Sequence, residues 1–242
     1  MDDILRNIEI INSRIKNACE RAGRNPDEVK LLLATKTVTA ERIKTALAAG
    51  VTLIGENKIQ EVKEKFETLK SVPHQKHFIG HLQTNKIKDI LKYDIACIQS
   101  IDRLSLAEKL HQRLLFEQKK INVFIQVNTS AEESKFGVSA ENTLQLVEQV
   151  AKLETLQIKG LMTIGLFSAD ARRVRKCFQL LKLLQQQIIS NNISNVEMNE
   201  LSMGMSGDLE AAIEEGATII RVGTAVFGKR IHPDSFYWNE QQ

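Results

Sequence analysis

A lysine at the end of a short apolar run, Lys36, is the side chain whose position in this sequence most suggests chemistry. It follows residues 31–34, an apolar segment typical of a buried strand. A lysine directed into the mouth of a barrel loses part of its hydration, which favours the neutral amine and makes it nucleophilic toward a carbonyl carbon. We therefore predict that Lys36 can form a Schiff base. The alternative, from spacing alone, is a strand-end lysine that points into solvent.

Two segments near the C-terminus predict a phosphate-binding site. In residues 202–208, small and hydroxylic side chains such as Ser206 lead directly into a helical pattern, and Gly223 and Thr224 do so after the last apolar run. Backbone N–H groups at a helix start attract a dianion, and βα barrels commonly bind phosphate at the loops after strands seven and eight. Ordinary helix capping is the alternative for either loop alone. Two such loops together with Lys36 favour the phosphate site.

The elements that must position these residues follow a βα rhythm. Isoleucines at helical spacing predict an amphipathic helix over residues 3–22, and eight strand and helix pairs follow. The predicted strands are 30–34, 53–54, 77–79, 95–99, 122–127, 158–161, 200–201 and 219–222. The predicted helices are 40–49, 58–70, 84–92, 103–118, 139–152, 171–190, 207–215 and 224–228. Eight pairs without an intervening linker favour an α/β fold, a single (β/α)8 TIM-type barrel with an extra N-terminal helix.

Reactive groups in such barrels come from the residues that follow the strands. These are Lys36, Asn57, His81, Ser100, Asn128, Met162, Ser202 and Arg221. We expect one domain, with the N-terminal helix at about 3–22, the barrel at about 29–230 and a C-terminal tail at 231–242 without an assigned role. Charged residues of the helix at 58–70, Glu61 and Lys65 among them, are expected to form a solvated face.

Composition excludes several classes of protein. Hydrophobic residues make up 43% and charged residues 26%, and a net charge of +3 with scattered basic residues predicts no nucleic-acid site. Cys19, Cys97 and Cys177 lack disulfide or metal-ligand spacing, which favours a reducing cytoplasm. The acidic N-terminus lacks a signal-peptide pattern, and no apolar run predicts a membrane helix. The five histidines show no ligand spacing, so no metal site is predicted.

Seven motifs occur in order between about residues 4 and 230. They are Ala34-Thr35-Lys36-Thr37, Ile54-Gly55-Glu56-Asn57 with Gln60-Glu61, His77-Phe78-Ile79-Gly80-His81-Leu82-Gln83-Thr84-Asn85-Lys86, Ser134-Lys135-Phe136-Gly137, Gly160-Leu161-Met162-Thr163-Ile164, Leu201-Ser202-Met203-Gly204-Met205-Ser206 and Arg221-Val222-Gly223-Thr224-Ala225-Val226-Phe227-Gly228. Together they resemble the pyridoxal phosphate homeostasis protein family, which includes the YggS-type proteins. The resemblance implies a fold-type III barrel similar to the N-terminal domain of alanine racemase.

The resemblance also implies roles for particular residues. Lys36 would form the internal aldimine with pyridoxal 5′-phosphate, Asn57 would lie near its ring and Met162 would line the ring face. The implied phosphate ligands are Ser202, Ser206, Gly223 and Thr224. Arg221 would face the pyridine nitrogen. Because a guanidinium keeps its proton, this contact would leave the ring nitrogen unprotonated and weaken the cofactor as an electron sink.

The function expected from the residues and the resemblance is binding and homeostasis of the cofactor in the cytoplasm, without catalysis. Its partners would be the cofactor and apo-enzymes that need it, but neither nucleic acid nor membrane. We expect a monomer, with a weak dimer as the alternative. Two other functions stay open: an amino-acid racemase, which would need an acid/base partner that this family of enzymes takes from a separate β-domain, and a regulator that senses the cofactor.

Overall fold

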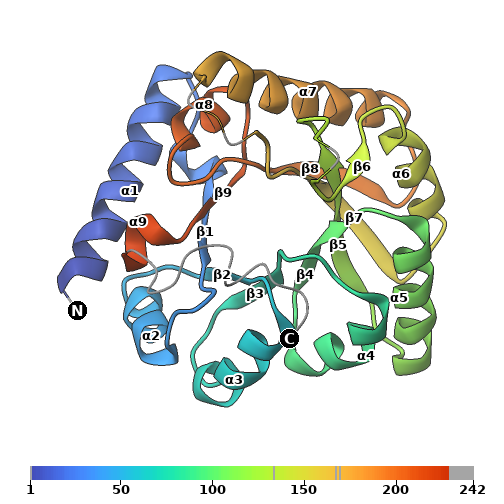
Figure 1. Ribbon diagram of the computed structural model, residues 1–242, viewed down its shortest axis with the longest axis horizontal. Coiled ribbons are helices and arrows are strands. Elements are labelled where there is room, and N and C mark those ends of the chain that lie inside the picture. The colour runs from blue at the N-terminus through green and yellow to red at the C-terminus, as the bar shows by residue number, and fades with distance from the viewer. Residues whose placement is uncertain (1, 133, 167, 169, 229–242) are drawn as a thin grey trace.

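A closed barrel of parallel strands forms the centre of the protein, and helices cover its outside (Figure 1). The computed structural model describes residues 2–132, 134–166, 168 and 170–228. Within these ranges the barrel strands are β1 (Lys30–Ala34), β2 (Leu53–Glu56), β3 (Gln75–Phe78), β4 (Cys97–Ile101), β5 (Ile121–Asn128), β7 (Leu156–Met162), β8 (Val196–Ser202) and β9 (Ile219–Val222). Each pairs with the next in this order, and β9 pairs with β1. The predicted TIM-type barrel is therefore confirmed.

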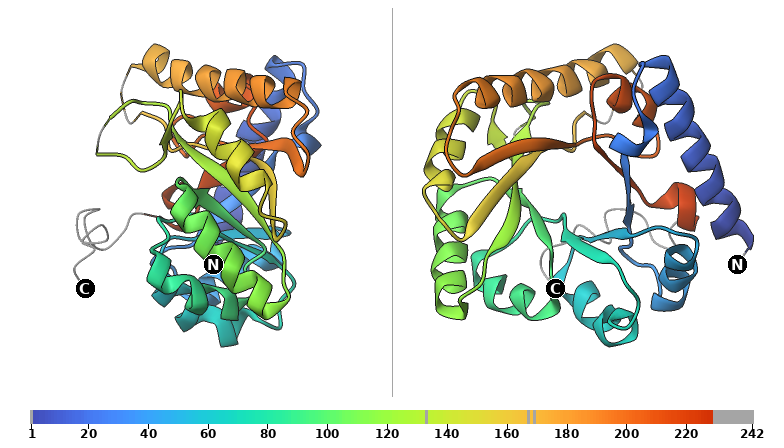
Figure 2. Two further views of the ribbon diagram at one scale, coloured as in Figure 1. Left: turned by 90° about the vertical axis from the view of Figure 1, so that its right-hand side faces the viewer. Right: turned by 180° about the vertical axis from the view of Figure 1, so that it is seen from behind.

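The helices follow the strands around the barrel (Figure 2). They are α1 (Asp2–Arg21), α2 (Ala40–Ala48), α3 (Ile59–Leu69), α4 (Ile87–Ile90), α5 (Leu104–Glu117), α6 (Thr143–Ala151), α7 (Ala171–Ser190), α8 (Leu209–Glu214) and α9 (Thr224–Phe227). The predicted helix at 84–92 is only partly α-helical, because short 3-10 turns flank α4. In the described ranges, no helix combines the length and apolar character that crossing a membrane requires.

One short strand, β6 (Val138–Ser139), was not predicted from the sequence. It pairs with the end of β5 outside the barrel, whereas the sequence predicts that a helix begins at Ser139. The strand β8 is also longer than predicted. Its first half carries Glu197 and Asn199, which line the N-terminal end of the barrel. Because these interior residues are polar, this half of β8 lacks the apolar pattern that predicts a strand. The predicted tail at 231–242 lies outside the described residues.

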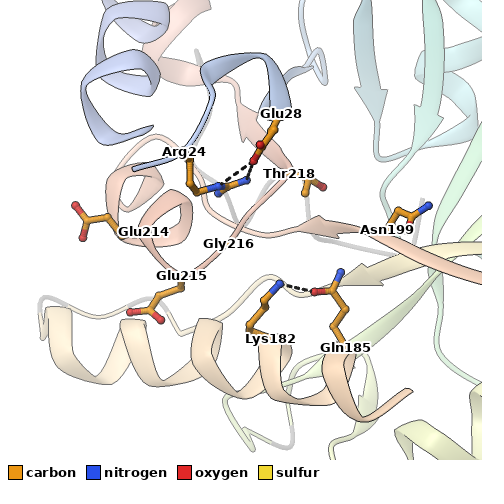
Figure 3. A pocket seen from close by; sticks show the side chains of 9 residues that line it. All are labelled: Arg24, Glu28, Lys182, Gln185, Asn199, Glu214, Glu215, Gly216 and Thr218. Atoms are coloured by element: carbon orange, nitrogen blue, oxygen red, sulfur yellow. Dashed lines mark hydrogen bonds and ion pairs between the residues drawn. The ribbon is translucent and has the colours of Figure 1, made fainter. Parts of the chain in front are cut away.

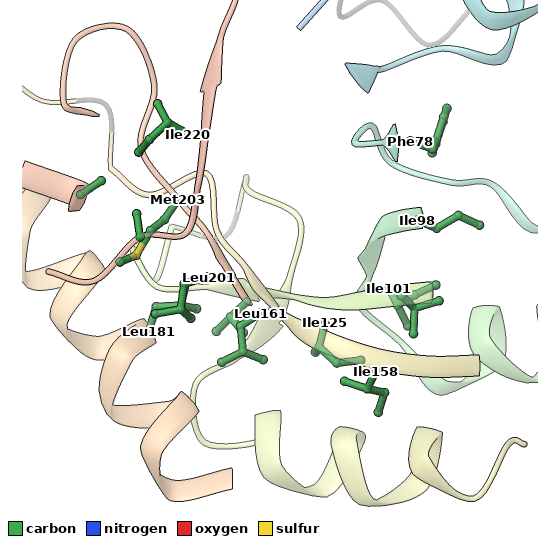
Figure 4. Close-up of a cluster of buried hydrophobic side chains, with 14 of the residues drawn as sticks. Phe78, Ile98, Ile101, Ile125, Ile158, Leu161, Leu181, Leu201, Met203 and Ile220 are labelled. Atoms are coloured by element: carbon green, nitrogen blue, oxygen red, sulfur yellow. The ribbon is translucent and has the colours of Figure 1, made fainter. Parts of the chain in front are cut away.

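Side chains alternate between the inside and the outside of the barrel along each strand. A small apolar layer fills the interior and consists of Leu32, Leu53, Cys97, Phe124, Met162 and Ile219. A larger cluster packs the outer strand faces against the helices; Figure 4 shows Ile125 and Leu161 of the strands with Leu181 of α7. Burying each such side chain contributes about 1.5 to 3 kcal/mol. Apolar packing inside and outside the barrel thus stabilises the fold, so the polar residues at the strand ends are not needed for the core.

Helix α1 supports two of the loops at the carboxyl ends of the strands. Its buried face consists of Ile4, Ile8, Ile11, Ile15, Ala18 and Cys19, and it packs against α8 and α9. Arg14 donates to the carbonyl oxygen of Ser206 at 3.0 Å and pairs with Glu210 at 2.7 Å. Asn7 donates to the carbonyl oxygen of Val226 at 3.0 Å. The extra N-terminal helix therefore fixes the predicted phosphate loops from outside.

Candidate functional site

Most of the side chains predicted to lie at the barrel mouth are at the carboxyl ends of their strands. These are Lys36, Asn57, His81, Asn128, Met162, Ser202 and Arg221. Ser100, like Arg221, is a buried residue one position before the last residue of its strand, because β4 runs to Ile101 and β9 to Val222. The residue that follows β4 is Asp102. The predicted strand ends at residue 99, two residues too early, so Asp102 is missing from the residues expected at the mouth.

Lys36 lies in the turn between β1 and α2 and is half-buried. Lys36 comes four residues after Leu32, whose side chain belongs to the interior layer. Residues an even number of positions apart along a strand lie on the same face. The residue that follows β9, Gly223, lies close to the end of β1. A Cβ on Gly223 would stand 3.2 Å from the carbonyl oxygen of Ala34. The structure therefore brings the end of β1 and the loop after β9 together, as the sequence predicts.

Arg221 begins a row of hydrogen bonds that crosses the barrel interior. Its Nη1 donates to Ser202 Oγ at 2.7 Å, and its Nη2 donates to the carbonyl oxygen of Thr163 at 2.6 Å. The Ser202 hydroxyl in turn donates to Gln99 Oε1 at 2.7 Å, and Gln99 Nε2 lies 2.7 Å from His77 Nδ1. Sequence reasoning gave no sign of Gln99, which joins strands far apart in the chain. The Ser202 hydroxyl is thus engaged on both sides.

Burial sets the protonation of both ends of this row. Burial lowers the pKa of Arg221 to about 10, although the nearby Asp208 carboxylate opposes that shift, so the guanidinium stays charged at neutral pH. Burial, with the charge of Lys30, lowers the pKa of His77 to about 4. A neutral His77 accepts from the Gln99 amide at Nδ1 and carries its proton on Nε2. All donors in the row therefore point away from Arg221.

The loop after β8 is built around a glycine. Gly204 has a φ of +89°, and a Cβ there would stand 2.4 Å from Ala212 Cβ, so only glycine fits. Its carbonyl oxygen accepts from the backbone N–H of Arg221 at 3.0 Å, and Asp208 accepts from the N–H of Met205. This loop is therefore shaped by its own backbone contacts. The helices after the two predicted phosphate loops, α8 and α9, are short, so backbone N–H groups rather than a long helix dipole would attract an anion.

Asn57 and His81 lie in two loops that pack closely. A Cβ on Gly80 would stand 2.0 Å from the carbonyl oxygen of Asn57, so a side chain at position 80 would push the loops apart. The His81 ring stacks on Phe136 with 3.9 Å between centroids. Its Nδ1 is 3.6 Å from Asp102 Oδ2, too far for a hydrogen bond but within reach of an ion pair when the ring is protonated.

A buried ion pair lies behind the turn that carries Lys36. Lys65 Nζ is 2.7 Å from Glu56 Oε1 and 2.8 Å from the carbonyl oxygen of Thr35, and the Thr35 hydroxyl donates to the same Glu56 oxygen at 2.6 Å. Lys65 was expected on a solvated helix face, and this was wrong: its exposed fraction is 8%. Charge patterning along one helix cannot show which lysine faces a carboxylate on the neighbouring strand.

The Glu56 carboxyl should make stability depend on pH. Burial raises its pKa to about 7, and the charge of Lys65 only partly offsets this. The unfolded chain, where a glutamate titrates near 4.3, releases the proton first, so stability falls as pH rises from about 4 to about 7. We expect Glu56→Gln to remove on the order of 1 to 3 kcal/mol of this decline, measured by urea unfolding at several pH values. Parallel profiles for the variant and the parent would contradict the assignment; Glu64→Gln, on the exposed face of α3, is the control.

Two hollows lie at the opposite, N-terminal end of the barrel. The larger, of about 510 Å³, is lined by residues of α7 and the α8–β9 turn together with Arg24 and Glu28 (Figure 3). The smaller, of about 260 Å³, opens into the barrel itself, where Lys30 pairs with Glu200 and Lys159 with Glu197. Because these charges already neutralise one another, and because barrels of this kind carry their sites at the other end, we place the site at the mouth with Lys36.

Comparison with known proteins first defines the class. The family model described as "Alanine racemase, N-terminal domain" matches residues 7–231. The solved alanine racemase of Clostridium difficile 630 superposes with a TM-score of 0.75 at 14% identity, over 97% of this chain and 58% of that one. At that identity the likeness shows the fold alone. The fold and the site thus define a barrel protein of the alanine racemase N-terminal type.

Relatives at higher identity define the family. A pyridoxal phosphate homeostasis protein of Aquifex aeolicus is 43% identical over 217 residues, which cover 90% of this chain and 94% of the relative. The one of Escherichia coli strain K12 is 36% identical over 233 residues, covering 95% and 98%. PipY of Synechococcus elongatus, solved with PLP bound, has a TM-score of 0.78 at 30% identity over 93% of this chain and 100% of that one. The chain belongs to the pyridoxal phosphate homeostasis protein family.

Proposed function

We propose that this protein binds pyridoxal 5′-phosphate through Lys36 and takes part in the homeostasis of that cofactor in the cytoplasm. The observation that carries the proposal is family membership over most of the chain, together with a relative solved with PLP bound. The position of Lys36, half-buried at the carboxyl end of β1, supports it. The three cysteines are free and buried, which suits a reducing compartment.

The side chains at the mouth fit the chemical groups of the cofactor. An amine at Lys36 suits its aldehyde, and the buried Arg221 cation suits the pyridine nitrogen. Met162, in the interior layer below the mouth, would line the ring and Asn57 would lie near it. The residues that would hold the phosphate are Ser206, Gly223 and Thr224. Because the Ser202 hydroxyl already bonds Arg221 and Gln99, we assign Ser202 an indirect part, through Arg221.

When bound, the cofactor supplies an aldehyde that exchanges between amines and a ring that withdraws electrons. Lys36 would hold the cofactor through its amine, in a linkage that releases one water when it forms and consumes one water when it breaks. Arg221 keeps its proton at neutral pH and so disfavours protonation of the facing ring nitrogen. This favours reversible holding over carbanion chemistry, and we propose a monomeric carrier that supplies apo-enzymes rather than a racemase.

The visible absorption spectrum of the purified protein with added pyridoxal 5′-phosphate tests the proposal. We expect an imine band that borohydride removes, because reduction of the carbon–nitrogen double bond yields a stable amine. A spectrum that is the sum of free protein and free cofactor, both before and after borohydride, would sink the proposal. Pull-down with and without the cofactor separates a carrier from a sensor, because only a sensor should change partners.

Thr224 is the first residue of α9, directly after Gly223, and it is exposed. We expect Thr224→Ala to weaken retention of the cofactor by about 1 to 2 kcal/mol, the contribution of one hydrogen bond to a charged group. The dissociation constant from dialysis measures this change. Thr224→Ser keeps the hydroxyl and should restore binding. If Thr224→Ala has the same dissociation constant as the parent, Thr224 is not a phosphate ligand.

A further inference from the structure

The turn that carries Lys36 is held from both sides by charged side chains of β2 and α3. On one side, Lys65 Nζ donates to the carbonyl oxygen of Thr35 at 2.8 Å, and Lys65 itself is paired with Glu56 at 2.7 Å. On the other side, the backbone N–H of Thr37 donates to Glu61 Oε1 at 3.1 Å. The residues immediately before and after Lys36 are thus both fixed by ionisable groups.

The backbone after Lys36 needs such a contact. Thr37 has a φ of +63°, in the left-handed region that a β-branched residue rarely adopts. A conformation of this kind persists only when surrounding contacts enforce it, and it is typical of functional sites. Glu61 provides that contact through the N–H of Thr37 itself. The strain therefore lies directly beside the lysine to which we assign the chemistry.

Stability alone does not explain why Glu56, Glu61 and Lys65 lie together behind this turn. Glu56 and Lys65 are 4% and 8% exposed, and a buried ion pair is often no more stabilising than apolar side chains of similar volume. Moreover, in the part of the chain that the structure describes, Glu56 Oε2 and Glu61 Oε2 are buried without a hydrogen-bond partner. Unsatisfied buried polar atoms are costly, and their presence beside a reactive residue calls for a functional reason.

We infer that Glu56, Glu61 and Lys65 are positioning residues for Lys36. They hold the Thr35–Thr37 turn in the strained shape that sets the direction and reach of the Lys36 amine, so that it meets the aldehyde already oriented. This inference rests on the proposed function, since it concerns how Lys36 reaches the cofactor. It does not assign these three residues any contact with the cofactor.

Glu61 offers the sharper test, because it lies near the surface and its loss should not unfold the protein. Glu61→Ala removes the acceptor of the Thr37 N–H, whereas Glu61→Gln keeps an oxygen there and removes only the charge. We expect the alanine variant to form the imine band about fivefold more slowly and to bind pyridoxal 5′-phosphate about fivefold more weakly, the equivalent of one hydrogen bond. The glutamine variant should stay within about twofold of the parent. Glu64→Ala, on the exposed face of the same helix, is the matched control.

A second ligand separates positioning from general loosening. Pyridoxine 5′-phosphate carries the same ring and phosphate but no aldehyde, so it cannot react with Lys36. If Glu61 acts through Lys36, Glu61→Ala should bind this analogue as tightly as the parent does. Equal weakening for both ligands, or unchanged imine formation in Glu61→Ala, would overturn the inference. Lys65→Met adds a buried variant, and its melting temperature shows whether it is folded before its spectrum is compared.

The two proposals fail in different ways. If the parent protein shows no imine band, the proposed function is wrong. If the parent shows the band and Glu61→Ala forms it at the same rate, only the positioning role is wrong.

Discussion

Lys36→Ala is expected to abolish the borohydride-stable link to pyridoxal 5′-phosphate while leaving the protein folded. Because we assign the reaction with the aldehyde to the Lys36 amine, the imine band should be lost completely. Because the Lys36 side chain is only half-buried, the free energy of unfolding should change by less than about 1 kcal/mol. Absorption spectra and urea unfolding of the same sample measure both effects.

Peptide mapping locates the link in the parent protein. After borohydride and trypsin, the label should appear on a peptide covering residues 31–42, because a modified Lys36 is not cleaved and the next sites are Lys30 and Arg42. Lys58→Ala, at an exposed position at the start of α3, should keep the link and serves as the control. A trappable adduct that persists in Lys36→Ala would falsify the lysine assignment.

Arg221→Met should cause the largest loss of stability among the substitutions at the mouth. It leaves the Thr163 carbonyl without the donor it has in the folded protein and removes the donor to Ser202 Oγ, both in a buried environment. We expect the free energy of unfolding to fall by about 2 to 4 kcal/mol, since buried groups left unsatisfied cost about 1 to 3 kcal/mol each. Urea unfolding measures this, and Arg172→Met, an exposed arginine, should change it by less than about 0.5 kcal/mol.

The same variant tests the electrostatic role of Arg221. If its guanidinium faces the pyridine nitrogen, Arg221→Met should let that nitrogen take up a proton and change the pH dependence of the visible spectrum. Arg221→Lys keeps a charge but lacks the planar fork that reaches two oxygens at once, so it should recover only part of the stability. A spectrum whose pH dependence is the same in Arg221→Met as in the parent would remove Arg221 from the cofactor site.

Part of the fold and of the site could be predicted from the sequence, because the patterns that predict them involve only residues close together in the chain. Apolar periodicity predicted α1, with Ile4 and Ile8 on its buried face, and it predicted β1 and β9. The barrel followed from counting strand and helix pairs, and the positions of Lys36 and Arg221 followed from the rule that polar residues after barrel strands meet at one end. Periodicity and strand ends depend only on neighbours in sequence, so these predictions needed no tertiary information.

What the tertiary structure alone decided is how side chains on different strands meet. The Ser202–Gln99 hydrogen bond joins residues 103 positions apart, and no local pattern marks Gln99 as its partner. Lys65 looked like one more surface charge, yet the register of α3 against β2 buries it against Glu56. A sequence specifies which residues face the interior, because alternation is local. Which of those residues touch is set by strand register and helix packing, and these exist only once the barrel has closed.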